Sequence, residues 1–138
     1  MVAPGTSAVS SKGEVVTKEG KPVKLDASPG TPDAPQQSNP VSEAPAGAVK
    51  LTMTASGFSP KEFTARAGQA VALSVTAGDS QTHVFMFDDA SLSAVAVGVA
   101  PGETRVITFN APKVGSYKFH CDVPGHSGRG ETGTMVVN

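Results

Sequence analysis

Residues 115–138 read GSYKFHCDVPGHSGRGETGTMVVN, two short β-prone segments that flank a loop carrying Cys121, His126 and Glu131. Successive side chains of a strand point to opposite faces. The first segment therefore puts Cys121 on the same face as its two aromatic residues and leaves His120 on the other. A thiol, an imidazole and a carboxylate in one loop are typical of a metal-binding site.

The rest of the chain from residue 48 onward has the same β character. Short alternating segments are separated by Gly, Pro and Asp, and they read LTMTA, EFTAR, QAVALSV, HVFMF and RVITF. This spacing predicts an all-β sandwich. Alternation assigns the core-facing side chains of two of these segments, namely Val71, Leu73 and Val75, and His83, Phe85 and Phe87. The exception is residues 89–99, DASLSAVAVGV, which fit either a short helical turn or an irregular crossover.

The first 46 residues differ from the rest in composition. Residues 27–47 contain five prolines and no aromatic residue, which is the composition of a solvated linker. Residues 14–25, EVVTKEGKPVKL, give a weak hairpin signal, and a lone hairpin either docks on a domain or stays loose. We therefore divide the chain into an N-terminal tail or tether, residues 1–46, and one domain, residues 47–138.

Length and charge limit the classes of function. A chain of 138 residues is long enough for one domain with a hydrophobic core. The 11 Lys and Arg nearly balance the 12 Asp and Glu, without a basic cluster, so nucleic acid and anionic membrane surfaces are poor partners. No apolar run reaches the roughly 18 residues of a membrane span, and the N-terminus lacks the apolar core of a signal peptide.

The only cysteine, Cys121, cannot form an internal disulfide. An isolated free thiol is usually a small buried apolar residue, but His126 follows Cys121 by five positions. A thiolate with two imidazoles is the copper ligand set of electron-transfer sites, usually completed by a weak axial group, and zinc accepts the same donors. The second imidazole should come from a distant strand. His83, which opens the HVFMF segment, is the candidate, although a lone histidine there would more often be structural.

Several segments resemble the cupredoxins, the small blue copper proteins. They are GFSPKEFTARAGQAVALSV, then His83, then PGETRVITFNAPKVGSYKFHC, then PGH and a closing GTMVV. The resemblance covers residues 48–138, and the Cys-x4-His spacing with VPGH inside it is most similar to the rusticyanin and sulfocyanin group. It implies a Greek-key β-sandwich that holds one copper ion per chain, with His83, Cys121 and His126 as the strong ligands.

Two positions depart from the family pattern. Where the family normally has an axial methionine, this chain has Glu131, which either binds the metal or turns to solvent. Its phase with Met135 and Val137, the expected core residues of the last strand, favours an inward Glu131; Met135 itself we interpret as core. Many members also place Asn or Ser after the first histidine, where this chain has Val84, so only the backbone N–H remains to contact the thiolate.

The expected function is electron transfer by a single copper that alternates between Cu(I) and Cu(II). A hard, anionic carboxylate favours Cu(II), so we expect a low potential and a green or red protein rather than a blue one. A closed site offers no position for a substrate, which predicts no catalysis. The alternatives are a copper-binding or copper-resistance protein without redox cycling, and a copper redox enzyme or sensor whose carboxylate dissociates.

The surroundings of the site complete these expectations. Val123, Pro124 and Gly125 would form a small apolar patch around His126 where redox partner proteins dock. His120 is expected to be a surface residue that hydrogen-bonds a neighbouring loop, the alternative being a ligand of a metal shared with another subunit. We expect a monomer in the periplasm or another extracytoplasmic space, tethered to a membrane through a removed N-terminal segment.

Overall fold

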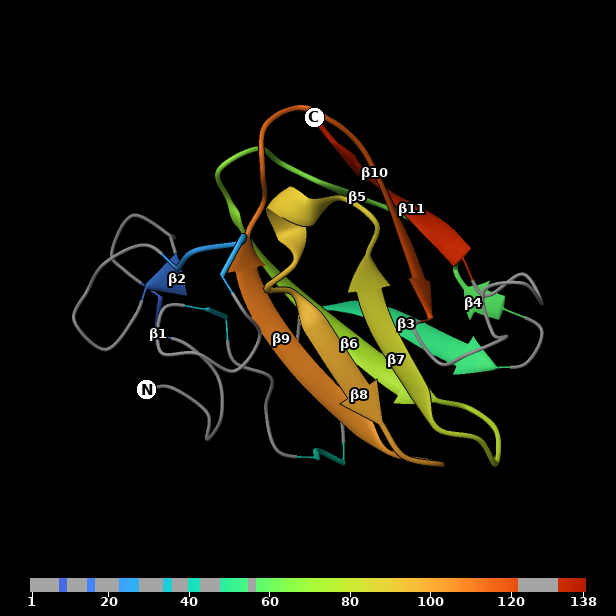
Figure 1. The fold of residues 1–138 in the computed structure, drawn as a ribbon. Coiled ribbons are helices and arrows are strands. Elements are labelled where there is room, and N and C mark those ends of the chain that lie inside the picture. Colours follow the sequence, from blue (N-terminus) through green and yellow to red (C-terminus); the bar gives the residue numbers. More distant parts are fainter. Residues whose placement is uncertain are drawn as a thin grey trace.

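The computed structural model describes residues 8–9, 15–16, 23–27, 34–35, 40–42, 48–54, 57–121 and 132–138. Within these residues the chain forms two facing β-sheets, a separate two-stranded ribbon and no α-helix (Figure 1). None of the described segments is a helix long and apolar enough to cross a membrane. The predicted all-β sandwich is therefore confirmed.

One sheet has four strands. In spatial order they are β4 (Gly57–Ser59), β3 (Val49–Thr54), β6 (Ala70–Ala77) and β9 (Thr104–Asn110). The β3 strand runs parallel to β6, whereas the other two pairs are antiparallel. Because β3 and β6 are neighbours without being consecutive, the chain crosses between the sheets, and distant segments become adjacent.

The other sheet has five strands and contains the residues of interest. Its order is β5 (Glu62–Ala65), β11 (Thr132–Val137), β10 (Gly115–Cys121), β7 (His83–Phe87) and β8 (Ala96–Val99). The β10 strand lies in the middle, antiparallel to both β11 and β7, and β11 runs parallel to β5 at one edge. Strands β7 and β10 are more than 25 residues apart in sequence, yet they are direct neighbours.

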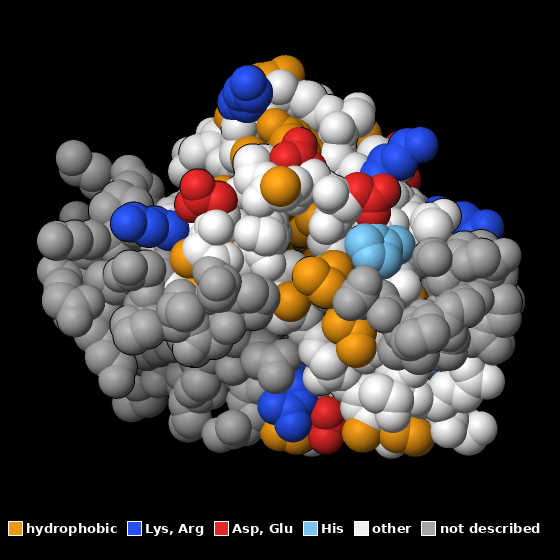
Figure 2. All heavy atoms as spheres, viewed as in Figure 1, with side chains coloured by type: hydrophobic (Ala, Val, Ile, Leu, Met, Phe, Trp, Pro, Cys, Tyr) orange, Lys and Arg blue, Asp and Glu red, His pale blue; other side chains and the backbone are white. Residues whose placement is uncertain are grey.

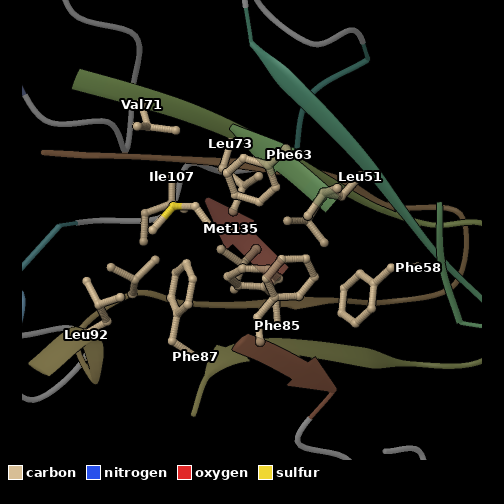
Figure 3. Close-up of a cluster of buried hydrophobic side chains, with 14 of the residues drawn as sticks. Leu51, Phe58, Phe63, Val71, Leu73, Phe85, Phe87, Leu92, Ile107 and Met135 are labelled. Atoms are coloured by element: carbon tan, nitrogen blue, oxygen red, sulfur yellow. The ribbon is translucent and has the colours of Figure 1, made fainter. Parts of the chain in front are cut away.

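The alternation expected from the sequence is observed in the strands. Side chains of the predicted inner face are buried, including Val71, Leu73 and Val75 in β6 and Tyr117, Phe119 and Cys121 in β10. Aromatic rings from both sheets interlock between them (Figure 3). The ring centroids of Phe58 and Phe119 lie 4.8 Å apart and those of Phe85 and Phe119 lie 4.9 Å apart, within the range of favourable aromatic contacts.

Residues 89–99 resolve into two elements. A 3₁₀ turn, η1 (Ala90–Leu92), begins after Asp89, whose carboxylate accepts a 2.9 Å hydrogen bond from the Ser91 N–H. This hydrogen bond from Ser91 lowers the pKa of Asp89. Residues 96–99 then form β8, an edge strand paired with β7. Both elements lie in the stretch for which the sequence left a helical turn or a crossover open.

The described parts of the N-terminal region contact the domain. Strand β2 (Val15–Val16) pairs with β1 (Ala8–Val9), and Val15 is fully buried. The Asn110 side chain makes two hydrogen bonds to the Val15 backbone. The Val15 N–H donates to Asn110 Oδ1 at 2.7 Å, and Asn110 Nδ2 donates to the Val15 carbonyl at 3.0 Å. Farther along, the Val41 N–H donates to the Thr104 carbonyl at 2.8 Å. These pieces are docked, while the division at residues 46 and 47 stays a prediction.

Candidate metal centre

Cys121 is the last residue of β10 and is 1% exposed. It faces the core together with Phe119, and across the ladder it is paired with Phe85 of β7. Its sulfur accepts a 3.4 Å hydrogen bond from the Val84 N–H. The backbone donor expected at Val84 is therefore present, and it links the Cys121 thiol of β10 to the neighbouring strand β7.

His83 begins β7 and is fully buried. Its Nδ1 atom lies 3.9 Å from Cys121 Sγ, although the two residues are 38 positions apart in the chain. The fold produces this contact because β7 and β10 are adjacent and the side chains of both residues point inward. The structure thus brings together two of the predicted ligands. His126 and Glu131 lie outside the described residues, and no cluster of three metal-binding side chains occurs among those that are described.

The space between these two atoms suits a metal ion. With bonds of about 2.0 Å to imidazole nitrogen and about 2.3 Å to thiolate sulfur, the lengths typical of zinc, a separation of 3.9 Å corresponds to an angle of roughly 130° at the ion. Such an angle fits the trigonal His2Cys arrangement of copper electron-transfer sites. A separation of 3.9 Å is also long for a direct hydrogen bond. The two donors are therefore compatible with a shared ion.

The second nitrogen of His83 has a carboxylate partner. His83 Nε2 lies 2.8 Å from Oδ1 of Asp79, and the same oxygen accepts a 3.1 Å hydrogen bond from the Gln81 N–H. Asp79 belongs to the turn before β7 and its side chain is 24% exposed. Sequence reasoning missed this residue. The available signal was an acidic residue in the polar turn GDSQT, four positions before a buried histidine.

The side chains of two further residues, His120 and Met135, lie away from the Cys121 thiol. His120 is on the outer face of the five-stranded sheet, and its Nδ1 pairs with the carboxylate of Asp88, the residue after β7. This confirms the expected surface hydrogen bond to a neighbouring loop. Met135 is fully buried opposite Tyr117, four residues along β10 from Cys121, or about 13 Å at roughly 3.3 Å per residue. Its interpretation as a core residue is confirmed.

Comparison with known proteins identifies relatives of this fold. Residues 33–137 match the family model described as a Cupredoxin-like domain. No curated protein sequence gives a significant match. Among solved structures, the chain is similar to dithionite-reduced auracyanin from the photosynthetic bacterium Roseiflexus castenholzii, with 25% identity and a TM-score of 0.57 over 67% of this chain and 99% of that one.

Two other auracyanins give similar values. Auracyanin B is 25% identical with a TM-score of 0.60, over 76% of this chain and 98% of its own. Auracyanin A, a "blue" copper protein from the green thermophilic photosynthetic bacterium Chloroflexus aurantiacus, is 25% identical with a TM-score of 0.52, over 67% and 100%. The matched region in each case is nearly the whole of the known protein.

Proposed function

The chain belongs to the cupredoxin-like family, and we propose that it is a copper electron-transfer protein with one ion per chain, held by His83, Cys121, His126 and Glu131. One observation carries this proposal: His83 Nδ1 lies 3.9 Å from Cys121 Sγ, and both side chains are buried. Copper supplies a one-electron couple at such a site. The similar auracyanin A is a blue copper protein, which agrees with this assignment.

The proposed role of Glu131 rests on the β10–β11 ladder. His120 is paired with Thr132, and the proposal requires this register to continue by one step, so that residue 131 stands opposite Cys121. Directly opposed side chains of antiparallel strands have Cβ atoms about 4.5–5.5 Å apart. Gly133 supports the inward phase, since a Cβ there would lie 2.4 Å from the Phe119 ring. His126 is assigned as the third strong ligand from its five-residue spacing after the cysteine.

An axial Glu131 carboxylate would lower the reduction potential. An anionic oxygen donor stabilises Cu(II) more than Cu(I), whereas thioether is soft and neutral. For a one-electron couple about 59 mV corresponds to roughly 1.4 kcal/mol, so a difference of a few kcal/mol lowers the potential by about 100–200 mV. A strong fourth bond would also weaken the bond between copper and the Cys121 thiolate, so we expect a green or red protein.

The residues around Cys121 are arranged in a way that suits electron transfer without structural rearrangement. The cysteine and His83 are on neighbouring strands; Phe85 is the ladder partner of Cys121, and its ring packs on that of Phe119 at 4.9 Å. The Val84 N–H, 3.4 Å from the sulfur, limits its movement. Close packing of the interior should limit the movement of these atoms when the charge of the site changes.

The proposal includes partners and location. Transient redox partners would dock on the apolar patch formed by Val123, Pro124 and Gly125 around His126, since electron-transfer contacts are small. On the face in Figure 2, acidic and basic side chains are interspersed rather than gathered into one charged patch. We propose a monomer in an extracytoplasmic space such as the periplasm, tethered through its N-terminal region, and without catalytic activity, since a site closed by Glu131 would offer no position for a substrate.

Voltammetry combined with optical spectroscopy tests the proposal. The copper-loaded protein should show a reversible one-electron couple and a thiolate charge-transfer band. His83→Ala should abolish that band, and retention of a normal band would show that His83 is not a ligand. Irreversible reduction with loss of copper would refute electron transfer and favour a copper-binding or copper-resistance role, the second candidate, which the replacement of the usual side-chain tie by Val84 favours.

Glu131→Met tests the axial assignment. The variant should be bluer, with a potential higher by about 100–200 mV if the carboxylate binds the ion. The matched control is Glu62→Met, which removes an exposed carboxylate on the edge strand β5 and should leave spectrum and potential unchanged. Equal behaviour of the two variants would show that Glu131 is not a ligand.

A further inference from the structure

We propose that Asp79 is a positioning residue for the metal: its carboxylate fixes the proton of His83 on Nε2, so that Nδ1 offers its lone pair toward Cys121, and its charge stabilises the oxidised ion. This rests on the proposed copper site. The main observation is the 2.8 Å contact between His83 Nε2 and Asp79 Oδ1. The other ring nitrogen, Nδ1, lies 3.9 Å from Cys121 Sγ.

The burial of His83 makes this contact consequential. A fully buried imidazole must satisfy its polar atoms within the protein. A neutral imidazole donates from one nitrogen and accepts at the other, and an ionised carboxylate only accepts. The Asp79 contact therefore requires the proton on Nε2. In the neutral ring the lone pair then lies on Nδ1, which faces Cys121 Sγ at 3.9 Å, and this is the form in which histidine binds a metal.

The position of the carboxylate is itself fixed. Oδ1 of Asp79 accepts from the Gln81 N–H at 3.1 Å, so the turn before β7 holds the same oxygen that meets His83. The side chain is 24% exposed, which leaves it partly hydrated and lowers the cost of keeping it charged. A charged acceptor on a fixed turn can orient the His83 ring.

The charge has a direct consequence for the metal. A carboxylate that accepts from a ligand histidine makes that histidine a stronger donor, and removal of such a partner typically lowers metal affinity about 10–100-fold. The effect is larger for the more highly charged ion. Asp79 therefore adds to the preference for Cu(II) from outside the coordination shell.

Two variants separate charge from hydrogen bonding. Asp79→Ala removes both, and its Cu(II) affinity should fall about 10–100-fold. Where a tenfold loss is confined to Cu(II), the potential rises by about 59 mV. Asp79→Asn keeps an oxygen acceptor and removes the charge, so it should keep the Nε2–H form and still raise the potential. The matched control is Asp88→Asn, which removes a carboxylate from His120 on the outer face and should move the potential less.

A readout on the metal-free protein makes the test independent of copper. Long-range ¹H–¹⁵N NMR should show His83 as the Nε2–H tautomer in the wild type and in Asp79→Asn, and a mixture in Asp79→Ala. An Nδ1–H wild-type tautomer would overturn the role of Asp79. A reversible couple whose potential and Cu(II) affinity ignore both Asp79 variants would overturn it too, while leaving the proposed function intact. If instead the wild type lacks a reversible couple but its Cu(II) affinity drops in Asp79→Ala, electron transfer fails and the role of Asp79 stands.

Discussion

Gly133→Ala tests how tightly the strand that leads into the candidate site is packed. Gly133 lies in β11 opposite Phe119, and a Cβ at this position would stand 2.4 Å from Cε1 and 2.5 Å from Cζ of that ring, and 2.6 Å from the Lys61 carbonyl oxygen. Real Cβ atoms do not approach so closely. The ring or the backbone must therefore move.

Neither neighbour can move at low cost. The Phe119 ring is fully buried and contacts Phe58 at 4.8 Å and Phe85 at 4.9 Å between ring centroids. The Lys61 carbonyl accepts a 2.9 Å hydrogen bond from the Thr134 N–H, so moving it breaks the contact between β11 and the edge of the sheet. Overpacking a well-packed core costs about 1–3 kcal/mol. We expect a loss near the upper end, about 3 kcal/mol of unfolding free energy.

Urea unfolding of the metal-free protein, followed by circular dichroism, measures this loss. Gly98→Ala is the matched control, because Gly98 is also a strand glycine, neither residue has positive φ, and its nearest atom is Val84 Cγ2 at 4.0 Å. The control should stay within about 0.5 kcal/mol of the wild type. If Gly133→Ala is as stable as the control, the packing of β11 against Phe119 is looser than the contacts imply, and the inward phase proposed for residue 131 loses its support.

Three further predictions concern the rest of the fold. Asn110→Ala removes both Asn110 hydrogen bonds to the buried Val15 backbone; the Val15 carbonyl keeps the Val23 N–H at 3.3 Å, but the Val15 N–H loses its Asn110 acceptor. The change should cost about 1–3 kcal/mol and speed proteolysis of the N-terminal region. Tyr117→Phe removes a 2.7 Å hydrogen bond to a backbone carbonyl and should cost about 0.5–1.5 kcal/mol in the same unfolding assay. The hydrogen bond from Arg105 holds the pKa of Glu103 below its ordinary value. The pair therefore stabilises the fold at pH values above the Glu103 pKa of the unfolded chain, and this contribution is lost as pH falls through the Glu103 pKa of the folded protein. Arg105→Gln should therefore be less stable than the wild type near neutral pH, and the difference should vanish in acid; a difference that persists would refute it.

Much of the sandwich follows from local patterns. Alternation assigned the inner faces of β6, β7 and β10 because each strand has one buried face, and a shift by one residue would expose every apolar side chain. The sequence pattern did not identify β8, because residues 96–99 are all small and apolar, although their burial alternates in the folded strand. Such a segment becomes a strand only because β7 offers it a free edge, and that partner is invisible in the local sequence.

The candidate site divides in the same way. The Cys-x4-His spacing pointed to Cys121, and the resemblance of this loop to a known ligand loop pointed to His83. The structure places His83 Nδ1 3.9 Å from Cys121 Sγ. Asp79 could not be recognised from spacing, because its role depends on His83 being buried and on a turn that aims one oxygen at Nε2. The docking of Val15 was equally hidden, since its partner Asn110 is 95 positions away.

Two carboxylates of the proposed site, Glu131 and Asp79, favour a low reduction potential. If the Cys121 thiolate and the Glu131 carboxylate both hold the ion, the site would carry no net charge with Cu(II) and one negative charge with Cu(I). The usual methionine would instead leave the reduced site neutral. Asp79 adds a further negative charge behind His83, only partly hydrated, so it too opposes reduction. Burial strengthens both effects because charges interact more strongly where water is excluded. In the proposed site, the Glu131 and Asp79 carboxylates would therefore both lower the reduction potential.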